Sequence, residues 1–110
     1  MKIQGSEQVL GQLVRDTDGR RLGRVVGVQC APDPYTVVWF LVALTGWRRR
    51  LRAVPAAAAR WDKHSALHVP YRRDQILQSP APAADHPVGA DFVRDDLRAY
   101  YAAARQGASR

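Results

Sequence analysis

Disulfides and membrane-spanning segments are both missing from this sequence of 110 residues. Cys30 is the single cysteine, so no intrachain disulfide can form, and its place in a strand-like stretch predicts a small buried apolar side chain rather than a reactive thiol. The apolar run at residues 37–44 is far shorter than the roughly 20 residues that span a bilayer, and residues 1–7 contain no apolar signal core. We therefore expect a soluble, cytoplasmic protein with no integral membrane segment.

Groups of residues that commonly carry catalysis or bind metals are also absent. The three histidines are His64, His68 and His86. On an extended strand the first two would lie about 13 Å apart, because a strand rises roughly 3.3 Å per residue, and they could not bind one zinc ion together. No Ser/His/Asp or Cys/His grouping follows from the spacing either. We therefore predict a protein that is not an enzyme and that has no catalytic, cofactor-binding or metal-binding residues.

Lysine is scarce although the chain is strongly basic. Arginine outnumbers lysine fifteen to two, and the formal net charge is +7 with a pI near 10.5. Such a charge attracts nucleic acid, anionic lipid or an acidic protein surface. An excess of arginine and alanine is also what a GC-rich genome produces without selection for binding, so the charge alone does not identify a partner.

The apolar run at residues 35–44 organises the predicted fold. Residues 37–44 contain no polar side chain, and the run is bounded by Asp33-Pro34 and Thr45-Gly46. Its β-branched and aromatic side chains predict a strand that is buried on both faces. One face can line the interior of a small barrel, whereas the other must be covered by a helix of the same chain or by a second subunit.

Further strands are predicted at residues 9–15, 20–30, 47–55 and 65–69. Between the first two, Asp16 to Gly19 predicts a hairpin turn rather than a calcium loop, because a third ligand before the glycine and a later glutamate are lacking. Gly23 and Gly27 lie within the second strand and indicate sharp curvature or a bulge. Such curvature is what a small barrel requires at its corners.

Helices are predicted in the second half of the chain. Residues 56–63 are expected to form a loop or a short helical turn with Trp61 folded inward, and residues 71–79 a short helix. Residues 91–105 predict an amphipathic helix of about four turns, with Asp91 as its N-cap. Its apolar stripe could dock over the outer layer of the central strand and consists of Val93, Leu97, Tyr100 or Tyr101, and Ala104.

Together these elements predict a mainly β fold, a small and highly curved β-barrel of five to six short strands with a short helix and a C-terminal amphipathic helix. The length fits one domain. The expected organisation is a flexible N-terminus at residues 1–8, the barrel-like domain at 9–79, a Pro/Ala-rich connector at 80–91, and a C-terminal helix and tail at 92–110.

Several motifs resemble those of PRC-barrel domains. The most specific is Asp18-Gly19-Arg20-Arg21-Leu22-Gly23-Arg24-Val25, which follows Leu10-x-x-x-Val14 and precedes the long apolar strand. Val54-Pro55 and Val69-Pro70-Tyr71, with Ile76 and Pro80, continue the resemblance to about residue 80. The chain departs from the family where Trp47 and three arginines replace a glycine-rich turn, and where Arg72 replaces a small hydroxyl residue that caps the short helix.

The resemblance implies a compact β-barrel that serves as an adaptor. The family includes the cytoplasmic part of the purple-bacterial reaction-centre H subunit, the ribosome maturation factor that engages a small-subunit ribosomal protein, and stand-alone prokaryotic proteins. It has no common catalytic residue. This chain is most similar to the stand-alone group.

Two functions follow as hypotheses. The first is a non-enzymatic protein-interaction module that binds an unknown protein partner and self-associates as a homodimer. Its contact would come from the strand with Trp39 and Phe40, or from the terminal helix with Leu97, Tyr100 and Tyr101.

The alternative is an RNA- or ribosome-associated protein. Its binding surface would be the arginine stripe beside Trp47, joined by arginines of the hairpin. The residues concerned are Arg48, Arg50 and Arg52 in the stripe, and Arg20, Arg21 and Arg24 in the hairpin. The stripe is more typical of a solvated edge strand whose charges prevent pairing with another sheet.

Overall fold

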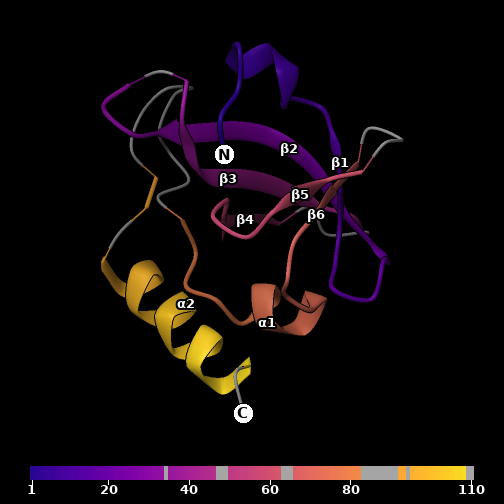
Figure 1. Cartoon of the computed structure of the whole chain (residues 1–110). Coiled ribbons are helices and arrows are strands. Elements are labelled where there is room, and N and C mark those ends of the chain that lie inside the picture. Colours follow the sequence, from indigo (N-terminus) through magenta and orange to yellow (C-terminus); the bar gives the residue numbers. More distant parts are fainter. Residues whose placement is uncertain (34, 47–49, 63–65, 83–91, 94, 109–110) are drawn as a thin grey trace.

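The structure is a computed structural model, and it describes residues 1–33, 35–46, 50–62, 66–82, 92–93 and 95–108. Its six strands form one mixed sheet in the order β4-β3-β2-β1-β6-β5, in which β1 and β6 pair in parallel and the other neighbours are antiparallel. Both helices lie below this sheet (Figure 1). The elements are the 3-10 helix Ser6–Gln8, β1 Leu13–Arg15, β2 Arg21–Cys30, β3 Val37–Leu44, β4 Leu51–Pro55, β5 Arg60–Trp61, β6 Ala66–His68, α1 Arg73–Leu77 and α2 Asp95–Ala108.

The mainly β prediction is confirmed, and so are the two longest strands. β2 and β3 coincide with the predicted second and central strands. Among the described residues, however, no ladder joins β4 to β5, so the sheet is curved but open between these two edges. None of the helices in the described part of the chain is both long and apolar enough to cross a membrane.

The hairpin turn between β1 and β2 was predicted correctly. A side-chain oxygen of Asp16 accepts hydrogen bonds from the backbone N–H groups of Asp18 and Arg20, both at 2.8 Å. Gly19 takes a φ of 81°, a conformation that glycine adopts at no steric cost. The Asp16 side chain is therefore a structural acceptor, which explains why it is buried.

The first strand is shorter than predicted. Residues 6–8 form a 3-10 helix, and Gly11 with a φ of 82° turns the chain before β1 begins at Leu13. Val9 is completely buried but does not belong to a strand. Val9 is apolar because it packs in the core. The alternation of residues around it resembles that of a strand, and for this reason the strand was predicted to begin too early.

The first three residues are attached to β3, which differs from the loosely attached terminus expected. Lys2 forms a bridge with Thr36, and the Ile3 N–H donates to the Tyr35 carbonyl at 2.7 Å. Ile3 is buried in the core. The buried isoleucine and the backbone hydrogen bonds explain the attachment.

The β2–β3 ladder has two register shifts, and the first lies beside a glycine of β2, as predicted. Val25 pairs with Val42 while Gly27 pairs with Leu41, so Val26 is an extra residue on β2. The second shift lies between Gln29 and Cys30. At Gly23, where the pairing is regular, a Cβ atom would lie 2.0 Å from the carbonyl oxygen of Ala43. The two backbones can approach this closely only because residue 23 is glycine.

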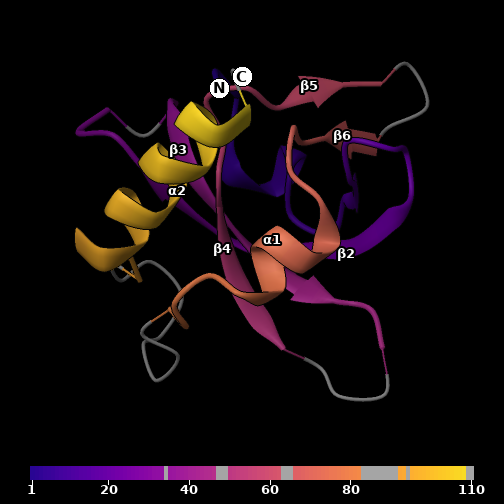
Figure 2. The same ribbon diagram turned by 90° about the horizontal axis from the view of Figure 1, so that it is seen from below.

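The central strand β3 is covered on both faces within the chain. Phe40, Val42 and Leu44 are buried on one face. On the other face the Trp39 ring meets the Tyr101 ring of α2 edge to face, with centroids 5.7 Å apart. The helix side of the sheet faces the viewer in Figure 2. Of the two covers that the sequence left open, the structure shows the terminal helix of the same chain against this face.

The outer edge of β4 is capped rather than bare. The Leu44 N–H donates to the Arg50 carbonyl, so by alternation Leu51, Ala53 and Pro55 direct their backbone groups away from β3. The Tyr101 hydroxyl donates to the Ala53 carbonyl at 2.8 Å, and the Arg52 guanidinium donates to the Leu51 carbonyl at 2.9 Å. Pro55 has no N–H to leave unpaired.

Two predictions in the second half need correction. Residues 60–61 form the edge strand β5 instead of part of a loop or helical turn, and Trp61 is 39% exposed rather than folded inward. An edge strand of two residues covers too little of the indole to bury it. α1 is also shorter than predicted, and it begins where the Gln75 side chain accepts the Arg72 N–H at 2.8 Å.

Arg73 fixes α1 to the sheet. Its guanidinium donates to the backbone carbonyl of Thr45, to the Thr45 hydroxyl at 3.2 Å and to the Leu22 carbonyl. The described part of the connector ends at Pro82, and the predicted N-cap Asp91 lies outside the described residues.

Candidate functional site

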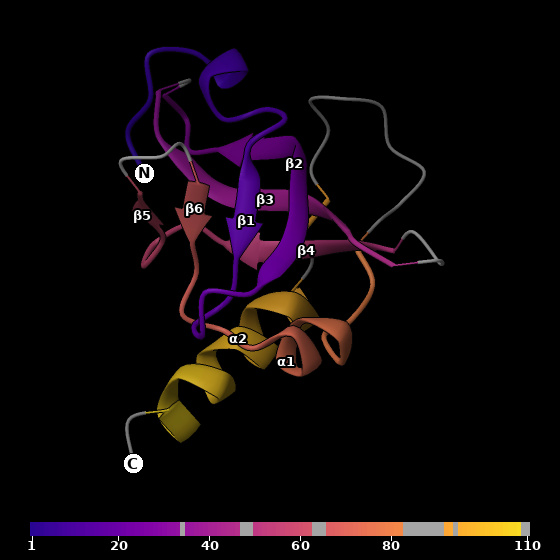
Figure 3. The ribbon, with the colours of Figure 1, turned by 90° about the vertical axis from the view of Figure 1, so that its right-hand side faces the viewer.

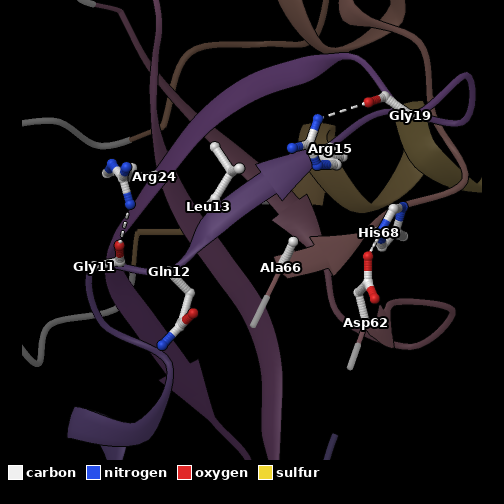
Figure 4. A pocket seen from close by; sticks show the side chains of 9 residues that line it. All are labelled: Gly11, Gln12, Leu13, Arg15, Gly19, Arg24, Asp62, Ala66 and His68. Carbon is white, nitrogen blue, oxygen red and sulfur yellow. Dashed lines mark hydrogen bonds and ion pairs between the residues drawn. The ribbon is translucent and has the colours of Figure 1, made fainter. Parts of the chain in front are cut away.

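A groove of about 710 Å³ lies over β1, between β2 on one side and β6 on the other. Figure 3 shows these strands facing the viewer, with both helices below the sheet. Neither α1 nor α2 contributes a lining residue to the groove. Its nine lining residues are Gly11, Gln12, Leu13, Arg15, Gly19, Arg24, Asp62, Ala66 and His68 (Figure 4).

The strand register places basic side chains in a row across this face. Arg15 of β1 pairs with Arg21 of β2 and with His68 of β6, and His68 pairs with Arg60 of β5. Paired residues project from the same face of a sheet, and neighbouring strands are about 4.8 Å apart. We call Arg21, Arg15, His68 and Arg60 the basic row.

Leu13, two residues before Arg15 on β1, belongs to a second layer of the groove. Leu13 pairs with Arg24 of β2 and with Ala66 of β6. Leu13 and Ala66 therefore form an apolar floor, and Arg24 stands beside it at the rim (Figure 4). The groove thus combines an apolar floor with arginine side chains at its rim.

Backbone carbonyls hold the two arginines of the groove in place. The Arg15 guanidinium donates to the Gly19 carbonyl at 2.9 Å, and the Arg24 guanidinium donates to the Gly11 carbonyl at 3.0 Å. A guanidinium has five N–H donors, so each retains donors for a partner. Because a neutral carbonyl does not cancel the charge, both arginines remain net cations at the rim.

His68 and Asp62 form a pair on the β6 side of the groove. The His68 Nε2 atom lies 3.2 Å from a carboxylate oxygen of Asp62, and the two side chains are 32% and 34% exposed. The carboxylate fixes the orientation of the imidazole ring. A His–Asp pair can move a proton, and none of the described residues that line the groove is Ser, Thr, Cys, Lys or Tyr.

Several arginines near this face have no carboxylate partner among the described residues, as is also true of Arg50, Arg52 and Arg73. Within the described part of the chain, ion pairs join Arg72 to Asp74 and Arg98 to Asp95, both on helices or at their starts. No ion pair among the described residues involves an arginine of β1, its hairpin turn, β2 or β5. These arginines are Arg15, Arg20, Arg21, Arg24 and Arg60.

The residues predicted as a protein-interaction surface are mostly inside the molecule. Phe40 and Leu97 are fully buried, and Trp39 and Tyr101 are nearly so. Tyr100 is half-buried, and its hydroxyl donates to the Gln75 carbonyl of α1. Burial raises the pKa of Tyr101, and less strongly that of Tyr100, above the usual value near 10.

The predicted arginine stripe is only partly described. Trp47 and Arg48 lie outside the described residues, as do His64 and His86. Arg50 is exposed, whereas Arg52 is half-buried with its Nε atom enclosed and without a hydrogen-bond partner among the described residues. The stripe therefore does not present Arg50 and Arg52 equivalently to solvent.

Sequence reasoning named Arg20, Arg21 and Arg24 but missed Arg15, Arg60 and the His68–Asp62 pair. The signal that could have found Arg15 was its place across the hairpin turn from three other arginines. Among the described residues, no three His, Cys, Asp or Glu side chains gather as ligands for a metal ion. No protein-family model matches the chain, and the comparison with curated proteins found no match.

Proposed function

We propose that this chain is a non-enzymatic interaction module whose binding surface is the groove over β1 together with the basic row. The observation that supports this proposal most directly is the set of unpaired arginines around the groove. Guanidinium groups bind carboxylates and phosphates through paired N–H donors, so the surface suits an anionic partner. The groove volume is also in the range of ordinary ligand sites, roughly 300–1,000 Å³.

The resemblance to PRC-barrel domains is a second, independent support. In that family such domains act as adaptors and have no common catalytic residue. The barrel form is part of the proposal. Among the described residues the curved sheet is open between β4 and β5. The proposal is that side chains, rather than backbone hydrogen bonds, close the barrel at this gap.

A charge-matched pair of variants tests the location of the surface. The double variant Arg15→Gln and Arg24→Gln removes two charges at the groove, while Arg72→Gln and Arg98→Gln removes the same charge from the helices. On immobilised heparin, a sulfated polyanion, the groove variant should elute at clearly lower salt than the helix variant. Equal elution of the two variants would mean that only net charge matters and would refute the proposal.

Self-association is a separate part of the proposal. The side chains first expected at a dimer contact are buried within the chain, so a dimer must use others. Tyr35, which precedes β3, and Val38, near the start of β3, are 56% and 37% exposed. A homodimer formed through this end of β3 would cover both side chains and leave the groove accessible.

A further inference from the structure

We propose that protonation of His68 strengthens the binding of an anionic partner at the groove, by turning a neutral ring in the middle of the basic row into a cation with an additional N–H donor. This inference rests on the proposed function. It goes further because it assigns a regulation to the same surface, namely tighter binding at mildly acidic pH than at neutral pH.

The sheet register places His68 between two arginines. Its pairing partners are Arg15 on β1 and Arg60 on β5, and paired side chains project from the same face. The His68 side chain is 32% exposed and lines the groove, so both solvent and a ligand can reach the ring. Among the described residues, the charged side chains that face it from the neighbouring strands are Arg15, Arg60 and, directly after β5, Asp62.

Asp62 determines which ring nitrogen takes up the proton. The His68 Nε2 atom lies 3.2 Å from the Asp62 carboxylate (Figure 4), and a carboxylate only accepts hydrogen bonds, so Nε2 carries the hydrogen of the neutral ring. Nδ1 then has a lone pair and no hydrogen-bond partner among the described residues. Protonation at Nδ1 replaces this lone pair, which repels an anionic oxygen, with an N–H group that can bind one.

One added charge is a large part of the charge on this face. Within the described residues, β1, its hairpin turn, β2, β5, β6 and residue 62 contain five arginines and three aspartates. The aspartates offset part of the arginine charge, so a protonated His68 adds substantially to the small excess of positive charge that remains. Histidine is the side chain whose charge ordinarily changes between about pH 5 and pH 8, whereas arginine stays charged throughout this range.

Fluorescence anisotropy with a labelled heparin oligosaccharide tests the inference. The sulfate groups of this probe stay ionised at mildly acidic pH, so a pH response comes from the protein. Affinity is measured at about pH 5.5 and about pH 7.5, at constant ionic strength. The samples are the unsubstituted protein, His68→Gln, and a control with both His64→Gln and His86→Gln, which removes the other two histidines and keeps His68.

The unsubstituted protein and the control should bind at least about threefold more tightly at the lower pH, because one charge-assisted contact is gained. His68→Gln should bind with similar affinity at both pH values. Calorimetry at about pH 6.5, in two buffers of different ionisation enthalpy, should detect proton uptake on binding in the first two proteins and none in His68→Gln, since proton and ligand binding are linked. Circular dichroism verifies the fold, and His68→Asn repeats the test with a shorter amide.

Two outcomes overturn the inference in distinguishable ways. If both His68 variants keep the full pH response, or if the control loses it, His68 is not the sensor. The proposed function then survives, provided that the Arg15→Gln and Arg24→Gln variant still elutes from heparin at lower salt than its helix control. If those two variants elute together, the surface itself is wrong, and the inference fails with the proposed function.

Discussion

Tyr101 joins α2 to the sheet through both its ring and its hydroxyl, so two substitutions at this residue give predictions of different size. Tyr101 is 2% exposed, and its ring centroid lies 4.9 Å from that of Tyr71 and 5.7 Å from that of Trp39. Its hydroxyl is the hydrogen-bond donor to the Ala53 carbonyl on the outer edge of β4. The variants Tyr101→Phe and Tyr101→Ala therefore separate the hydroxyl from the ring.

Tyr101→Phe should cost about 1–2 kcal/mol of unfolding free energy, because the ring stays but a buried carbonyl loses its donor. Tyr101→Ala should cost about 3–5 kcal/mol, since it also creates a cavity among the aromatic rings. These are large parts of a total stability of roughly 5–15 kcal/mol. In a domain of this size, each kcal/mol corresponds to a shift in Tm of roughly 4–8 °C.

Urea unfolding followed by circular dichroism and tryptophan fluorescence measures these differences. Tyr35→Phe is the control, because Tyr35 is 56% exposed and its loss of a hydroxyl should change stability by less than about 0.5 kcal/mol. If Tyr101→Ala is as stable as this control, α2 does not contribute its ring to the core, and the account of how β3 is covered is wrong.

Three further predictions concern pH, backbone approach and assembly. Burial raises the pKa of folded Tyr101 above its unfolded value near 10. The stability that Tyr101 contributes should therefore be complete below about pH 10 and decrease as the pH rises further. In measurements of unfolding free energy from pH 8 to 11, the loss of stability at high pH should be smaller for Tyr101→Phe. Gly23→Ala should destabilise by about 1–3 kcal/mol or more, because its Cβ would meet the Ala43 backbone, whereas Gly27→Ala meets the Leu41 side chain only at 3.4 Å and should cost less in the same urea titration. Light scattering at high micromolar concentration should give a dimer mass that falls to the monomer in Tyr35→Ser with Val38→Thr; a monomer at every concentration would remove the self-association proposal.

The sequence predicted those parts of the fold that local patterns determine. The run from Val37 to Leu44 and the turn around Asp16 to Gly19 carry strong local signals, so β2, β3 and the turn between β1 and β2 were predicted. Val9 was assigned to a strand because burial alone gives the same apolar residue type as a buried strand position. Trp61 was placed inside because its size predicts burial, although a two-residue edge strand leaves it partly exposed.

The groove could not be predicted in the same way. Arg15 and His68 are neighbours only because β1 and β6 pair in parallel, and their register depends on the whole intervening chain. Local periodicity contains no information on such a pairing. The arginines of the hairpin could be found from sequence, but their arrangement with His68, Asp62 and the apolar floor required the structure.

The parallel pairing of β1 with β6 also has a consequence for the order in which the molecule forms. β1, β2, β3 and β4 are joined by antiparallel contacts between successive segments, and such local contacts close short loops early. The pairing of β6 with β1 instead joins segments that are far apart in the sequence. We therefore expect amide hydrogens of β6 to exchange faster than those of β2 and β3, so that the β6 side of the groove forms last in folding and is lost first when the protein is stressed.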